Sequence, residues 1–164
     1  MRSPGESPTA ADIATVSEQL GRPARDIVGI SARCVCGNPV AVITQPRLHT
    51  GTPFPTLYYL SQPAATKAAS RLEAEGKMVE YQDRLAADED ARAQYQAAHD
   101  DFLAEREALE HVGETAGISA GGMPTRVKCL HTLIAHSLSV GPGINPVGDW
   151  ALEDTPWSIA QCHC

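Results

Sequence analysis

The chain has few aromatic side chains, which make up 5% of its 164 residues. A core must therefore be built mainly from Ala, Val, Leu and Ile. No apolar run approaches the roughly 20 residues that cross a bilayer. The single Arg2 near the start is not followed by the apolar stretch of a signal peptide. We therefore expect a cytoplasmic protein with no membrane partner, in which residues 1–9 form a disordered lead-in.

Positive charge is also scarce, with 13 Lys and Arg against 20 Asp and Glu and a net charge of −7. The whole imbalance lies in residues 71–110, which hold 12 acidic and 5 basic residues. This overall sign disfavours non-specific binding of nucleic acid. The simple interpretation of the acidic segment is a solvated helix face. The alternative is an interaction module whose acidic helices dock a basic protein partner.

The order of turn residues, apolar runs and helix formers predicts an α+β fold. We expect a small antiparallel sheet of about three strands in the N-terminal half, covered by helices. A single domain would span residues 10–150, followed by a loose C-terminal tail at 151–164. The predicted strands are 26–32, 40–44 and 56–60. The predicted helices run from the cap Thr9 to Leu20, over 63–75, over 77–110 with a break near 88–90, and over 124–140.

Thiol and imidazole groups predict a metal site at the tip of the first hairpin. Cys34 and Cys36 would supply two ligands, and Cys129 with His131 the other two, with His136 in reserve. Four nitrogen and sulfur ligands suit structural zinc, and thiolates also hold iron centres. In a reducing compartment such cysteines are more often ligands or reactive thiols than disulfides.

The metal interpretation has an alternative, in which Cys34, Cys129 and His136 are core residues. The single residue between Cys34 and Cys36 is a shorter spacing than the commoner zinc knuckle has. We interpret the tail pair Cys162 and Cys164 as adventitious, with a role as additional ligands as its alternative.

A glycine-rich segment before the predicted helix at 124–140 indicates an anion site. The backbone at Gly121 and Gly122 would approach a ligand closely, and Arg126 and Lys128 would lie in the first helical turns. Arg47 would complete a clamp around the anion. No phosphate-loop or dinucleotide fingerprint is present. The preferred function is therefore binding of a small anionic, phosphate-bearing ligand. Scattered surface arginines in ordinary salt bridges are the alternative.

The same segment holds candidate catalytic residues. Cys129 follows Lys128 close to a predicted helix N-terminus, where a thiol pKa is lowered. His131 or His136 would act as the base, and an enzyme acting on the bound ligand is one form of the predicted function.

Two blocks of the sequence resemble an uncharacterised family that occurs mainly in actinobacteria, domain of unknown function 501. The first block is Cys34 to Gly37, 46–47 and 51–60, and the second is 121–131 and 141–146. The resemblance covers about Ala11 to Trp150 and implies no established activity or cofactor. It departs at Gln62, where the family often has a cysteine, and it does not include Cys162 or Cys164. We expect the two blocks to meet in space at one site.

Overall fold

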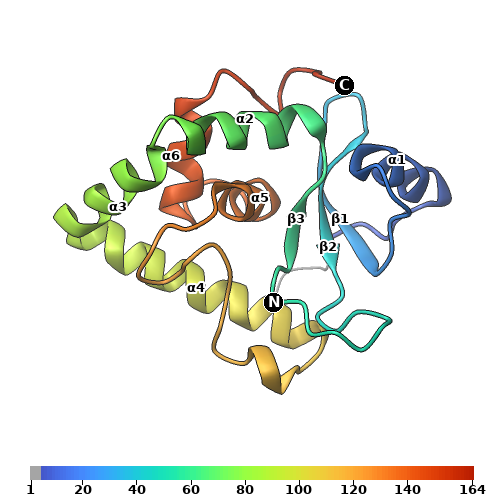
Figure 1. Ribbon diagram of the computed structural model, residues 1–164, viewed down its shortest axis with the longest axis horizontal. Coiled ribbons are helices and arrows are strands. Elements are labelled where there is room, and N and C mark those ends of the chain that lie inside the picture. Colours follow the sequence, from blue (N-terminus) through green and yellow to red (C-terminus); the bar gives the residue numbers. More distant parts are fainter. Residues whose placement is uncertain (1–4) are drawn as a thin grey trace.

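The computed structural model describes residues 5–164 and consists of a three-stranded antiparallel sheet with helices on both of its faces (Figure 1). The strands are β1 (Ile27–Arg33), β2 (Pro39–Thr44) and β3 (Tyr58–Leu60), in the order β1-β2-β3. In the register of the sheet, Val42 lies opposite Ile30 on one side and Tyr59 on the other. The predicted α+β class is confirmed.

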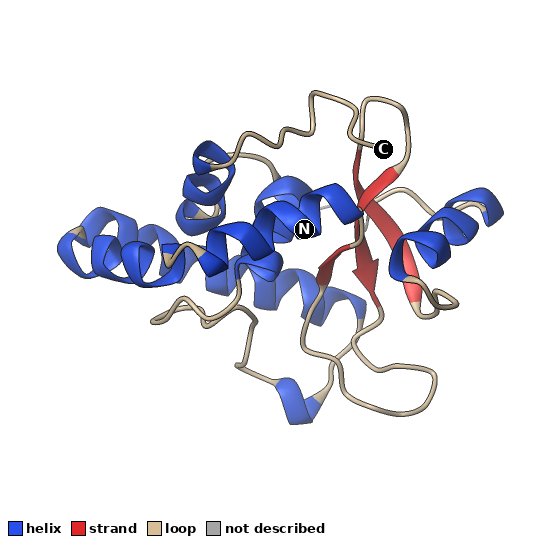
Figure 2. Ribbon diagram, turned by 45° about the horizontal axis from the view of Figure 1, so that its top comes forward, coloured by secondary structure: helices blue, strands red, loops and turns tan. Residues whose placement is uncertain are grey.

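The central strand β2 is buried along its whole length, because helices cover both faces of the sheet. Helix α1 (Ala10–Leu20) lies on one face, where Val16 packs with Ile30 and Val42 (Figures 1 and 2). Helix α5 (Leu130–Val140) packs on the other face. Helices α2 (Pro63–Ala74) and α6 (Pro146–Asp154) pack against α5 on that side and complete the main core.

The long acidic segment forms two helices, α3 (Lys77–Ala87) and α4 (Glu89–Leu109), followed by a short 3₁₀ turn, η1 (Gly113–Thr115). The Asp88 side chain accepts the backbone N–H of Ala91 and so caps α4. The predicted break near 88–90 is thus confirmed. Helix α1 begins as predicted, with Thr9 and Asp12 forming a reciprocal capping box.

The predicted helix over 124–140 is wrong at its N-terminal end, because α5 begins only at Leu130. The preceding segment folds back on itself. The N–H of Arg126 donates to the carbonyl of Gly122 at 2.8 Å, and that of Lys128 to the carbonyl of Gly121 at 2.8 Å. These bonds close single turns that do not continue as a helix, and Arg126 and Lys128 lie in a loop. They therefore do not lie in the first turns of a helix.

Both ends of the described chain are attached to the fold. Near the start, Glu6 forms a β-bridge with Ile30, while residues 1–4 of the predicted lead-in lie outside the described residues. Where the sequence predicted a loose tail, Trp157 is buried and its Nε1 donates to Gln62 Oε1 at 3.0 Å. Within residues 5–164, no helix combines the length and the apolar character needed to cross a membrane.

Candidate functional site

The turn between β1 and β2 presents Cys34 and Cys36. The N–H of Cys34 donates to the carbonyl of Asn38 at 2.9 Å, and that of Gly37 to the carbonyl of Cys34 at 2.8 Å. Gly37 has a φ of 93°, which a side chain would disfavour. Cys34 is buried and Cys36 is exposed, so one thiol faces inward and the other lies at the surface.

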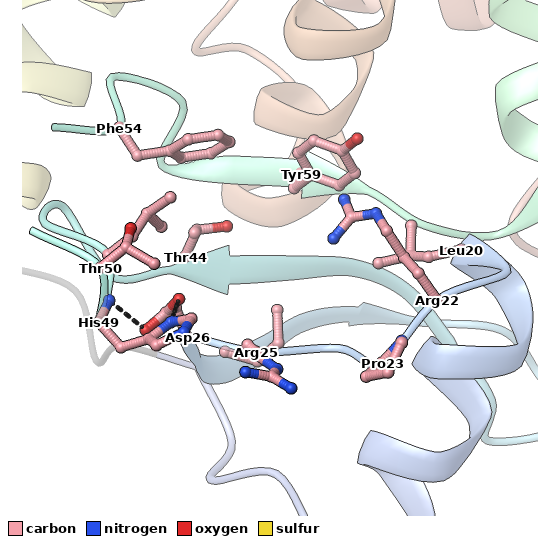
Figure 3. A pocket seen from close by; sticks show the side chains of 12 residues that line it. Leu20, Arg22, Pro23, Arg25, Asp26, Thr44, His49, Thr50, Phe54 and Tyr59 are labelled. Carbon is pink, nitrogen blue, oxygen red and sulfur yellow. Dashed lines mark hydrogen bonds and ion pairs between the residues drawn. The ribbon is translucent and has the colours of Figure 1, made fainter. Parts of the chain in front are cut away.

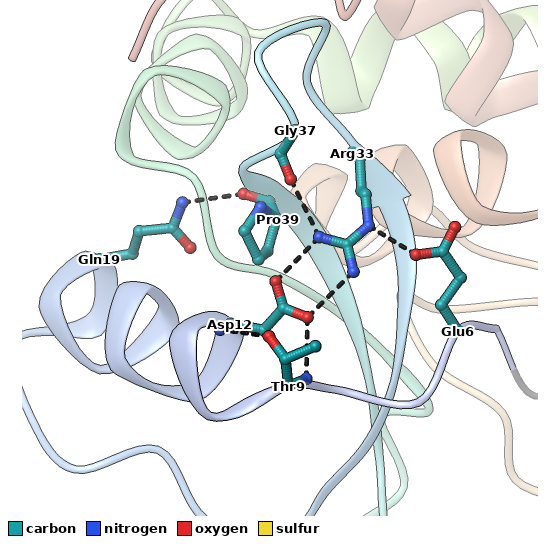
Figure 4. Close-up of polar contacts among 7 residues, drawn as sticks. All are labelled: Glu6, Thr9, Asp12, Gln19, Arg33, Gly37 and Pro39. Atoms are coloured by element: carbon teal, nitrogen blue, oxygen red, sulfur yellow. Dashed lines mark hydrogen bonds and ion pairs between the residues drawn. The ribbon is translucent and has the colours of Figure 1, made fainter.

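Arg33 anchors this turn to α1 and to the start of the chain (Figure 4). Its guanidinium donates to both carboxylate oxygens of Asp12, at 2.9 and 3.0 Å, and to Glu6 at 2.8 Å. A further bond, at 2.9 Å, reaches the carbonyl of Gly37 inside the turn. Hydrogen bonds from Arg33 hold the pKa of Asp12 far below its usual range. The turn that carries the two cysteines is therefore fixed in place.

The C-terminal segment returns to the same turn and brings Cys162 and Cys164 with it. The sulfur atoms of the four cysteines all lie within 4.8 Å of one another. Figure 1 shows the C-terminus beside the loop that joins β1 and β2. Gln62 just before α2 holds the tail, because its Nε2 donates to Cys164 Sγ at 3.1 Å while its Oε1 accepts from Trp157.

The four sulfur atoms lie close enough together to converge on one metal ion. Zinc–sulfur bonds of about 2.3 Å place the sulfur atoms of a tetrahedron about 3.8 Å apart, so only small movements separate this cluster from that geometry. All the cysteines are free thiols. A hydrogen bond from the backbone N–H of Cys36 lowers the pKa of Cys34 to about 7, whereas burial raises the pKa of Cys164.

A second cluster forms where the start of α5 meets α2. Cys129 is the N-cap residue of α5, and its sulfur, the His131 ring and the Glu73 carboxylate lie within 4.8 Å of one another. His131 Nδ1 is 3.3 Å from Glu73 Oε1, and His131 Nε2 is 3.1 Å from Ser70 Oγ. The other carboxylate oxygen of Glu73 accepts the N–H of Leu130 at 2.8 Å.

In this second cluster, the thiolate of Cys129 and the protonated form of His131 stabilise each other. Burial alone would raise the pKa of Cys129, but hydrogen bonds from His131 and Thr132 outweigh it and lower that pKa. The hydrogen bond with Cys129 raises the pKa of His131, and the negative charge of Glu73 adds to this effect. Cys129 and His131 line a hollow of about 230 Å³ between β3 and the start of α5.

The structure divides the predicted metal ligands between these two clusters. Cys34 and Cys36 group with the tail cysteines, while Cys129 and His131 group with Glu73. His136, the predicted reserve ligand, is fully buried with its ring stacked on Tyr58. Its Nδ1 lies 3.1 Å from the Asn145 amide, so His136 occupies the core position that the alternative interpretation gave it.

Arg47 does not lie with the other residues predicted to bind an anion, which share the loop before α5. Arg47 pairs with Glu114 at 2.8 Å, and its backbone N–H bonds Glu110 just beyond the end of α4. The carbonyl of Arg126 instead accepts from Tyr95 near the start of α4. Since 15 residues of α-helix span about 22 Å, Arg47 and Arg126 approach opposite ends of α4.

Gly121 and Gly122 allow the loop to pack closely against its own backbone and against α5. A Cβ at Gly122 would lie 2.7 Å from the carbonyl oxygen of Arg126, and one at Gly121 would lie 2.7 Å from the Leu133 side chain. The close backbone approach that the sequence indicated is thus made with the chain's own residues. The side chains of Arg126 and Lys128 are exposed.

Another hollow, of about 220 Å³, lies beside the end of α1 and contains two of the arginines near the hairpin (Figure 3). Asp26 and His49 form an ion pair of 2.7 Å at one end of it, and Arg22 and Tyr59 lie at the other. Hydrogen bonding to His49 lowers the pKa of Asp26. The carboxylate therefore stays ionised and opposes the positive charge of Arg22 and Arg25.

Sequence reasoning kept Cys162 and Cys164 only as the alternative to an adventitious pair, and it missed Glu73. Cys162 and Cys164 repeat the one-residue spacing of Cys34 and Cys36, and that repetition was the signal that could have found them. Glu73 gave no local signal. Only the packing of α2 against α5 shows that Thr66, Ser70 and Glu73, which share one helix face, lie beside the start of α5.

Comparison with known proteins gives a family and no activity. Residues 30–153 match the model of a family described as a protein of unknown function, DUF501. The match confirms the resemblance and ends before Cys162. No curated protein and no solved structure matches the chain.

Proposed function

The chain belongs to the DUF501 family, and for this member of it we propose a metal-binding domain in which Cys34, Cys36, Cys162 and Cys164 hold one zinc ion. The observation that carries the proposal is the convergence of four thiols from opposite ends of the chain to within 4.8 Å. The chain has only five cysteines, so a cysteine-rich composition does not explain why four of them lie together. Four thiolates make a closed coordination shell, which is typical of structural zinc.

Zinc fits this cluster better than iron does. Thiolate tetrahedra bind both metals. Three of the four cysteines are exposed, however, so an iron centre here would be open to solvent and to oxidants. Zinc has no redox chemistry and is indifferent to that exposure. The ion would fasten the C-terminal tail to the β1–β2 turn and would leave no position open for a substrate.

Elemental analysis of protein purified without chelators tests the proposal. We expect one zinc per chain, and a content far below one in the double variant Cys162→Ser, Cys164→Ser. Both residues are exposed, so their replacement leaves the core unchanged. The matched control is Cys129→Ser, which keeps its zinc because Cys129 belongs to the other cluster. A chain without metal, or zinc that survives the double variant, overturns the proposal.

The other functions predicted from the sequence stay proposals without a supporting contact. A small phosphate-bearing ligand would have to use Arg126 and Lys128 without Arg47, which is engaged by Glu114. A basic protein partner would dock on the exposed acidic residues of α3 and α4. Figure 1 shows α3 far from the sheet.

A further inference from the structure

We propose that Cys129, His131 and Glu73 form a nucleophilic thiol site that accepts a small uncharged acyl group from an ester or thioester. This site is separate from the four-cysteine cluster and independent of its metal. Its three groups come from α2 and the start of α5, and Cys129 and His131 line the hollow described above.

The position of Cys129 suits a nucleophile. As the N-cap residue of α5 it lies at the end of the helix where backbone N–H groups lack helical partners. These groups and the helix dipole favour negative charge on the sulfur. The Thr132 hydroxyl adds a contact to Cys129 Sγ at 3.5 Å. The thiol is half-buried, so it is shielded without being closed off from the hollow.

His131 is held by one contact on each of its ring nitrogens. Glu73 lies 3.3 Å from Nδ1 and Ser70 lies 3.1 Å from Nε2. Glu73 is fixed in turn by the N–H of Leu130 at 2.8 Å. A thiol, an imidazole and a carboxylate within 4.8 Å of one another are the kinds of groups that cooperate to activate nucleophiles in unrelated folds. The mutual pKa shifts of Cys129 and His131 agree with a thiolate–imidazolium pair.

The hollow indicates the chemical class of the substrate. Apart from Cys129 and His131, its lining consists of hydroxyl-bearing and apolar side chains, namely Thr56, Tyr58, Tyr59, Leu60, Thr66 and Thr132. No arginine or lysine among residues 5–164 lines it, so this part of the chain offers no cationic partner for a carboxylate or phosphate on the acyl group. A volume of about 230 Å³ suits a short acyl chain.

The proposed step is acyl transfer to sulfur. Cys129 Sγ attacks the carbonyl carbon, a C–S bond forms, and the bond from carbon to the leaving oxygen or sulfur breaks. His131 gives its proton to the leaving group. Water then attacks the thioester, His131 takes a proton from it, and the sulfur leaves as thiolate. The positive end of the α5 helix dipole would stabilise the oxyanion.

Reaction with p-nitrophenyl acetate tests the site directly. We expect release of p-nitrophenolate together with one acetyl group on the peptide that contains Cys129, located by mass spectrometry. Cys129→Ser should abolish acetylation at that position. His131→Asn should slow it about 100-fold, the lower end of what a general acid–base group contributes. The matched control His49→Asn, at the exposed ion pair with Asp26, should leave the rate unchanged.

A pH profile of iodoacetamide alkylation on the unaltered chain provides a readout that needs no variant. The alkylation rate of Cys129 should reach half of its maximum at a pH below about 8.5, the pKa of an unperturbed thiol. The variant His131→Asn should move this midpoint pH upward. An ordinary midpoint with no response to His131→Asn overturns the proposal. Metal that is lost only in Cys129→Ser also overturns it, because it would identify this cluster as a metal site. Zinc content measured on the same samples reports the four-cysteine cluster separately.

Discussion

Individual polar side chains determine where the functional groups of this chain lie. Cys129 and His131 could be singled out from the sequence because their types and spacing are visible in it. Glu73 could not, because it is one of many acidic residues in a helical segment and gains meaning only through its contacts with His131 and Leu130. The structure uses the charge of Arg33 on Asp12 and Glu6.

The Arg33–Asp12 pair gives a prediction at this scale. Asp12→Asn should lower the free energy of unfolding by about 1–3 kcal/mol, since it weakens two charge-assisted hydrogen bonds to a largely buried group. The folded pKa of Asp12 is lowered. Its contribution to stability is therefore complete above the unfolded pKa of about 3.9 and is lost as the pH falls toward the folded value.

Urea unfolding at neutral pH and near pH 3 measures this effect. The stability of the unaltered chain should fall more between the two pH values than that of Asp12→Asn. Asp83→Asn on the exposed face of α3 serves as the control and should follow the unaltered chain. Equal losses in all three proteins would show that Asp12 is not the group responsible.

At the scale of elements, the sequence predicted those with strong local signals. The cap at Thr9 and the break before α4 were visible because capping residues and charge patterns are local. The predicted start of α5 at residue 124 was wrong, because hydrogen bonds within the preceding loop compete with helix formation there. Helix α6 was overlooked, although Asn145 followed by Pro146 is a recognisable N-terminal signal.

The close contact between α5 and α6 requires a glycine, without a side chain, at position 148. A Cβ at Gly148 would lie 2.2 Å from Ser137 Oγ and 2.3 Å from the carbonyl oxygen of Leu133. Gly148→Ala should therefore destabilise the fold by about 1–3 kcal/mol or more, because the two helices must separate to make room. Thermal unfolding measures the loss. Gly113→Ala, where a Cβ would meet nothing within 4 Å, should leave the midpoint nearly unchanged.

For the whole molecule, the sequence predicted one site, whereas the structure divides the predicted ligands between two clusters. The α+β class was accessible because strands and helices differ in their periodicity. The contact between Cys34 and Cys164 could not be predicted from the sequence. It joins residues far apart in the chain and depends on how Gln62, just before α2, and Trp157 place the tail. A zinc ion at this point would make the tail an integral part of the sheet edge.

This arrangement predicts where zinc acts on the dynamics of the chain. Zinc binds only when the tail and the turn are together, so it should suppress their local opening by a factor of 1 + [Zn]/Kd, about 100-fold at a free zinc concentration of 100 times Kd. Hydrogen exchange should therefore slow at residues 34–38 and 157–164 when zinc is added, and accelerate there when a chelator removes it. Amides in the middle of α4, which no cysteine of the cluster adjoins, should exchange at the same rate in both states. The double variant Cys162→Ser, Cys164→Ser should show no response to zinc in either segment. Slower exchange around Cys129 instead would place the ion in the other cluster and contradict a zinc-fastened tail.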